Sequence, residues 1–371
     1  MHTQPLRRTT WGFAALYGVI GSVVIAIVVM AFVWPAATSR VQNLPVGIAG
    51  PPESVTALEG VLAEQDPAPF VLHDVAARDD AVAAIEQREL YGAILLGDVT
   101  AGEAPEVLIA TAASPVAAQA LRGVAAQLQA QISSGVQTTL TDRLTAILTA
   151  LQAGQVPQLP PAAGASLEVP TVVVTDVVPL AAGDHTGAGL GASVFPLVLG
   201  GILGGVLLSL LVQGVVRRLV GLLVYGAAAG VLIVLVMQTW FGILQGPWLV
   251  NAAVVGLAVS ATAALVVGLN ALMGPPGIAV AAVITMLIAN PIAGAAAPPQ
   301  FLPEPWGAIG QWFVPGAAAS LLRSVGYFPE AATIAQWLIL GAWLVIGIVL
   351  ALVGHYREAA DIPPSAAQLE A

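Results

Sequence analysis

The sequence predicts an α-helical integral membrane protein with six transmembrane helices and an extracytoplasmic α/β domain inserted between helices 1 and 2. Three observations lead to this fold class. Hydrophobic residues make up 58% of the 371 residues and charged residues only 9%, whereas soluble domains carry about 25% charged residues. Six apolar runs are close to the roughly 20 residues that span a bilayer. All 21 acidic residues lie outside these runs.

The first apolar run, residues 11–34, predicts a signal-anchor helix preceded by a cytoplasmic tail. It is longer than the core of about 7–15 residues found in a cleaved signal peptide. Cleavage near Ala37 is the alternative. Arg7 and Arg8 precede the run, and positive charge favours the cytoplasmic side of a membrane. We therefore expect the N-terminus in the cytoplasm and the following residues outside.

Residues 35–190 predict the extracytoplasmic α/β domain. Strand patterns alternate with helix patterns here, which favours a small, partly parallel sheet with helices packed on it. The expected helices are 53–64 and 79–89, and the expected strands are 44–49, 70–75, 91–96, 106–110 and 169–175.

A long helix is predicted over 115–151. Apolar residues recur at spacings of three or four from Leu121 to Leu151, which forms one continuous stripe on a helix. Ser133-Ser134-Gly135 could divide it into a hairpin. Two interpretations of the stripe remain open: it packs on the domain's own sheet, or it forms a dimerising stalk.

Residues 191–354 predict the rest of the membrane bundle. The expected helices are 192–214, 219–241, 249–272, 277–296 and 335–354. Arg217 and Arg218 lie at the first inner turn, and Arg357 follows the last helix at the start of a cytoplasmic tail, 355–371. With Arg7 and Arg8, these residues are the expected topology determinants, and they place both termini in the cytoplasm.

The outer segment 298–333 is too polar to span the membrane. It predicts short amphipathic helices at 308–313 and 316–325 that lie in or dip into the membrane interface. Arg323 in this segment is the one basic residue among the predicted spans and their turns that does not follow the positive-inside pattern.

Small and polar residues within the spans suggest how the helices pack. Three glycine pairs have the small-xxx-small spacing that lets membrane helices approach closely: Gly200 with Gly204, Gly201 with Gly205, and Gly226 with Gly230. They predict packing within the bundle or, alternatively, an oligomer interface. Asn251, Asn270 and Asn290 are candidates for polar contacts between helices or for the lining of a pathway.

Several chemistries are excluded or disfavoured. The chain has neither cysteine nor lysine, so it can form no disulfide, Walker P-loop or lysine Schiff base. The spans lack ionisable residues, which disfavours a proton-coupled pump. The four histidines have no metal-ligand spacing, and the net charge of −10 disfavours nucleic acid as a partner. We predict no catalytic, cofactor-binding or metal-binding residue and no enzyme activity.

The layout resembles that of the ABC-type-2 permeases, particularly actinobacterial members of the phage infection protein-like group, which carry a long outer domain after the first helix. The residues that carry the resemblance are Val177–Asp184 leading to Phe195, then Asn290–Gly294, Leu302–Gln311, Pro315-Gly316 and Arg323–Phe328. The sequence departs from the family at the inner turns, which are only 213–219 and 273–277 and offer little room for coupling helices.

The resemblance implies a bacterial plasma-membrane permease-like subunit, embedded in the lipid bilayer, that forms a homodimer. It would export an amphipathic or lipid-like substrate with a separate ABC ATPase subunit. The alternative is a non-transporting envelope protein whose outer domain binds a partner or ligand.

Overall fold

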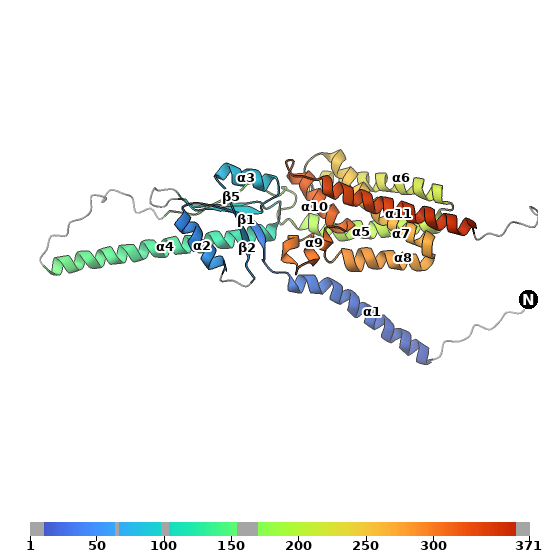
Figure 1. Cartoon of the computed structure of the whole chain (residues 1–371), viewed down its shortest axis with the longest axis horizontal. Helices are drawn as coiled ribbons and strands as arrows, with labels where there is room; N and C mark the ends of the chain where they lie inside the picture. Colours follow the sequence, from blue (N-terminus) through green and yellow to red (C-terminus); the bar gives the residue numbers. More distant parts are fainter. Residues whose placement is uncertain (1–10, 64–66, 98–103, 154–169, 361–371) are drawn as a thin grey trace, which may run out of the picture.

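The computed structural model describes residues 11–63, 67–97, 104–153 and 170–360. Figure 1 shows an α/β domain and a helical bundle arranged end to end, with helix α1 (Trp11–Thr38) beside the bundle. The chain is mostly helical, and the sheet lies entirely within the α/β domain.

The α/β domain contains a five-stranded sheet of order β2-β1-β3-β4-β5. Only the β3–β4 pairing is antiparallel, so the predicted partly parallel sheet is confirmed. The strands are β1 (Leu44–Ala49), β2 (Phe70–Asp74), β3 (Gly92–Leu95), β4 (Glu106–Ile109) and β5 (Val173–Asp176). The last strand begins later than expected, since residues 170–172 do not join the ladder.

Helices cover both faces of the sheet, because its central strands are apolar on both sides. Helix α2 (Pro52–Ala63) and the start of α4 (Pro115–Gln152) pack on one face, around Ile48 and Val107. Helix α3 (Arg78–Glu86) packs on the other, around Leu108.

Helix α4 is continuous through Ser133-Ser134-Gly135 and starts at Ser114, whose hydroxyl caps the amide of Ala117 at 3.2 Å. Only its first part is packed, through Ala117, Ala118, Leu121 and Ala125. Figure 1 shows the rest projecting from the domain, away from the bundle. The stripe therefore packs on the sheet at its N-terminal end, whereas Leu144 and Leu151 are 60% and 57% exposed.

Five helices in the described part of the chain are long and apolar enough to cross a membrane. They are α1, α5 (Ala188–Leu211), α6 (Val215–Val234) continued by the π-helix η1 (Leu235–Trp240), α7 (Trp248–Met273) and α11 (Ile334–Ala360). The chain is thus a multi-pass membrane protein. Helix α7 lies at the centre, packed against α5, α6, α10 and α11.

The fifth expected span, 277–296, does not form a full-length helix. Helix α8 (Pro275–Ala282) and the π-helix η2 (Val283–Ala289) together reach only about 22 Å, against about 30 Å for a bilayer core. The helical run ends at Asn290, whose amide donates to the carbonyl of Thr285 at 3.1 Å. Pro291 has no N–H with which to continue the ladder.

The 298–333 segment contains η3 (Pro299–Phe301), α9 (Trp306–Gly310) and α10 (Val314–Tyr327). Helix α10 is buried against α7 and α11 rather than lying flat on the bundle's surface. Ala317, Leu321 and Leu322 are fully buried in the bundle core. Its polar side chains Arg323 and Ser324 are buried as well, and they form hydrogen bonds at the packed surface.

Candidate functional site at the domain–bundle junction

The α/β domain is attached to the bundle through the 298–333 segment. The chain between α1 and β1 runs along η3, where the amide of Arg40 donates to the carbonyl of Phe301 at 3.2 Å. The Gln42 Nε2 atom donates to the carbonyls of Gln300 and Leu302, at 3.2 and 2.9 Å. These bonds satisfy backbone groups that the short η3 turn leaves unpaired.

Two phenylalanines of the segment anchor the domain. Phe301 joins the core on the α2–α4 face of the sheet, and Phe328 joins the core on the α3 face. They are 2% and 1% exposed, and burying such a side chain contributes about 1.5–3 kcal/mol. The segment therefore contributes a side chain to the apolar core on each face of the sheet.

A cleft of about 450 Å³ opens at this junction, within the range of about 300–1,000 Å³ typical of small-molecule sites. Asn43 at its edge donates from Nδ2 to Glu304 Oε1 at 3.2 Å. The lining is apolar with a few amide groups and one carboxylate: Asn43, Pro299, Gln300, Leu302, Glu304, Pro305, Gly307, Ala308 and Gln311. Such a lining suits an amphipathic molecule.

Arg88 joins the end of α3 to α10. Its backbone has a positive φ of 62°, which ends the helix and turns the side chain toward the bundle. Nη1 donates to the Ser320 carbonyl at 2.9 Å and to the Ser324 hydroxyl at 2.6 Å. The guanidinium also lies over the ring of Phe328, 5.5 Å from its centroid. Burial lowers the pKa of Arg88.

Arg323 lies on α10 between the two serines that Arg88 contacts, and it is only 7% exposed. Its Nη2 atom donates to the carbonyl of Ala295 at 3.0 Å. Burial, with the neighbouring charge of Arg88, lowers the pKa of Arg323 to about 10. The basic residue that the predicted topology leaves unexplained is therefore packed at the junction.

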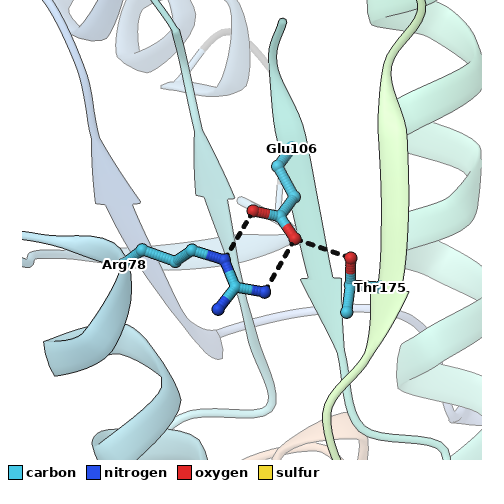
Figure 2. Close-up of polar contacts among 3 residues, drawn as sticks. All are labelled: Arg78, Glu106 and Thr175. Atoms are coloured by element: carbon cyan, nitrogen blue, oxygen red, sulfur yellow. Dashed lines mark hydrogen bonds and ion pairs between the residues drawn. The ribbon is translucent and has the colours of Figure 1, made fainter.

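A second polar group ties α3 to the sheet (Figure 2). Arg78 donates from Nε and Nη2 to the two carboxylate oxygens of Glu106, at 2.8 and 3.0 Å, and the Thr175 hydroxyl donates to Glu106 at 2.6 Å. The hydrogen bond from Arg78 is the main cause of a lowered pKa for Glu106. This arrangement links α3, β4 and β5. Its role is to stabilise the domain, and it does not indicate a functional site.

The predicted packing glycines lie at helix contacts inside the chain. A Cβ atom at Gly201 or Gly205 would lie 2.5 or 2.6 Å from the Cβ of Thr262 or Val266 on α7. Gly204 faces the ring of Tyr225 on α6. Gly226 and Gly230 on α6 face Ser260 and Ala252 on α7. Gly200 is more open, although its carbonyl accepts a 2.7 Å bond from the Tyr225 hydroxyl.

Only one of the three predicted asparagines makes a side-chain hydrogen bond within the described residues. Asn251 is fully buried, and its Nδ2 donates to Gln238 Oε1 at 2.9 Å and to the Gln245 carbonyl at 2.7 Å. It holds the start of α7 to η1. Asn270 and Asn290 use their backbone groups in helix ends.

The predicted topology determinants have different environments. Arg7 and Arg8 lie outside the described residues. Arg217 is exposed at the start of α6, and Arg357 lies within α11. Arg218 instead caps α5, donating to the carbonyls of Val212 and Ser209 at 2.7 and 3.0 Å.

Sequence reasoning did not identify Arg88, Gln42 or the cleft. The one available signal was Arg323, a basic residue in an otherwise apolar outer segment. Its partners are distant in the sequence, so no spacing rule points to them. No family model, curated protein or solved structure matches the chain. Function is therefore inferred from the sequence and the junction geometry.

Proposed function

We propose that the chain is a permease-like subunit of the bacterial plasma membrane that exports an amphipathic or lipid-like substrate with a separate ABC ATPase, in the manner of ABC-type-2 permeases. In this arrangement the short α8–η2 run completes a sixth crossing with the residues after it. Both termini are cytoplasmic, and the α/β domain is extracytoplasmic. The observation that carries the proposal is the cleft at the junction.

The cleft lies where a molecule leaving the bilayer would meet the α/β domain. Helix α1 packs loosely, since its most apolar stretch is not buried by the rest of the chain. Its C-terminal end contacts the bundle through Trp34, whose ring centroid is 5.8 Å from that of Trp306. Trp306 immediately precedes Gly307 and Ala308 of the cleft lining. A lipid-like molecule thus enters between α1 and the bundle and reaches the cleft.

The energy source would be external, because the apolar runs 192–214, 219–241, 249–272, 277–296 and 335–354 carry no Asp, Glu, His or Lys that could couple transport to protons. An ATPase subunit would engage the end of the bundle opposite the α/β domain. Among the described residues, exposed Arg217 and the short turns at Gly214 and Gly274 offer surface there. Homodimerisation would give two such ends to a paired ATPase.

Purification in mild detergent followed by ATP-hydrolysis measurements tests the proposal. We expect an ATPase to co-purify and its hydrolysis to rise with added membrane lipid extract. Ala308→Trp fills the cleft and should reduce that stimulation several-fold. Ala146→Trp, on the exposed part of α4, is the matched control and should leave it unchanged. Recovery of envelope proteins alone, without an ATPase, contradicts the export proposal.

One observation favours a second function, that of an envelope protein binding a partner through the α/β domain. The projecting part of α4 carries exposed Leu144, Leu148 and Leu151, and exposed apolar stripes often mark interaction surfaces. In that case Leu148→Gln abolishes recovery of the partner, whereas Ala308→Trp has no effect on it.

A further inference from the structure

The junction contains two arginines, Arg323 buried and Arg88 partly buried, that form no ion pair with a described carboxylate. The ion pair found in the described part of the chain is Arg78 with Glu106. Arg88 and Arg323 instead contact carbonyls and a hydroxyl. An uncompensated buried charge is costly, several kcal/mol in typical proteins, and two like charges near each other add repulsion.

Both arginines also retain unused hydrogen-bond donors. A guanidinium has five N–H groups. Within the described residues Arg88 donates from Nη1 and also has the Tyr91 side chain as a hydrogen-bonding neighbour, and Arg323 donates from Nη2. Neither arginine is among the side chains with a buried, unpaired nitrogen or oxygen, so the remaining donors reach accessible space. Arg88 contacts Ser320 and Ser324, which flank Arg323 on α10. The unused N–H groups of the two arginines therefore lie in the same small region of the junction.

We propose that Arg88 and Arg323 together form a binding site for a phosphate group at the junction between the α/β domain and α10. A guanidinium matches phosphate oxygens in geometry and can form two parallel bonds with them. Phosphate has enough oxygens to accept donors from both side chains, and its negative charge offsets their repulsion.

The phosphate comes from an outer-leaflet lipid headgroup or from a soluble anion. The tryptophan side chains Trp34 and Trp306 at the same end of the bundle mark the level at which headgroups lie. The site is independent of the export proposal, since it requires only the junction and would exist in a protein that transports nothing.

Thermal unfolding of the purified, delipidated full-length chain tests the site. The probes are inorganic phosphate against chloride at equal ionic strength, and phosphatidylglycerol against an uncharged glycolipid. We expect phosphate-containing probes to raise the unfolding temperature. Arg88→Gln and Arg323→Gln should weaken the apparent affinity about tenfold or more, whereas Arg122→Gln, exposed on α4, should not change it.

The result of this experiment distinguishes the two sources of the phosphate. Stabilisation by inorganic phosphate shows a site open to soluble anions, and stabilisation by phosphatidylglycerol alone shows a headgroup site. If Arg323→Gln does not fold, Arg323→Lys replaces it. Lysine keeps the charge but cannot form two parallel bonds, so binding should weaken several-fold. Absence of stabilisation by either phosphate probe, or unchanged affinity in every folded variant, overturns the proposal.

Discussion

At the residue scale, the fold depends on a few close helix–helix contacts and a few side-chain hydrogen bonds. Glycines of α5 and α6 let these helices lie against α7 where a side chain would not fit. Arg88 and Gln42 tie the α/β domain to a segment more than 200 residues away in the chain. Because each tie involves few atoms, single substitutions can test it.

Gly201→Ala should destabilise the bundle, because the new Cβ would meet the Cβ of Thr262 at 2.5 Å and neither atom lies at the end of a flexible side chain. Overpacking of this kind costs about 1–3 kcal/mol. Gly200→Ala is a control on the same helix, since its nearest neighbour would be the Tyr225 hydroxyl at 3.9 Å. Chemical unfolding in detergent measures both; equal effects would contradict the α5–α7 contact.

The ion pair of Glu106 predicts a loss of stability in acid. Its hydrogen bonds lower the folded pKa below the ordinary value of 4.5. The stabilisation is therefore complete above that value and is lost as the pH falls through the folded pKa. Wild-type unfolding temperature should fall below about pH 4.5 more steeply than that of Glu106→Gln. Glu53→Gln, at an exposed position, should keep the wild-type slope.

At the element scale, α4 and α10 each pack differently from what their apolar pattern predicts. The stripe of α4 is regular, but only about its first four turns pack on the sheet and the chain leading into β5. Helix α10 is short yet almost entirely buried. Periodicity reveals which face of a helix is apolar, whereas the surroundings decide how much of that face is covered.

The two ends of α4 should respond differently to substitution. Leu121→Ala removes a fully buried side chain and should cost about 2–5 kcal/mol. Leu144→Ala removes one that is 60% exposed and should change the stability of the monomer by less than about 0.5 kcal/mol. Chemical unfolding at several protein concentrations checks this. A large, concentration-dependent cost at Leu144 would indicate that a second copy covers the stripe.

At the scale of the whole molecule, one end of the bundle carries the α/β domain, and the described residues at the other end include the short turns at Gly214 and Gly274. Figure 1 shows the start of α1 and the end of α11 at the end opposite the α/β domain. The proposed cleft and phosphate site both lie at the domain end. The side of the membrane on which the α/β domain lies therefore decides which molecules can reach the junction.

Cysteine labelling tests this sidedness without background, because the chain has no cysteine of its own. In intact cells, Thr149→Cys on α4 should react with a membrane-impermeant maleimide. Gln213→Cys, in the turn between α5 and α6, should react only after permeabilisation. The opposite pattern would reverse the topology and place the junction inside the cell.

The sequence by itself determined the membrane character, five of the six predicted helices of spanning length, the strands of the sheet and the extent of α4. These depend on run length and periodicity, which are local properties. Only the tertiary structure decided the shortened α8–η2 run, the burial of α10 and the cleft. It also revealed the Arg88–Arg323 pair, which depends on contacts such as that of Arg88 with Ser324, 236 positions apart. No local sequence pattern predicts such a contact, because it arises from how the helices and the sheet pack together.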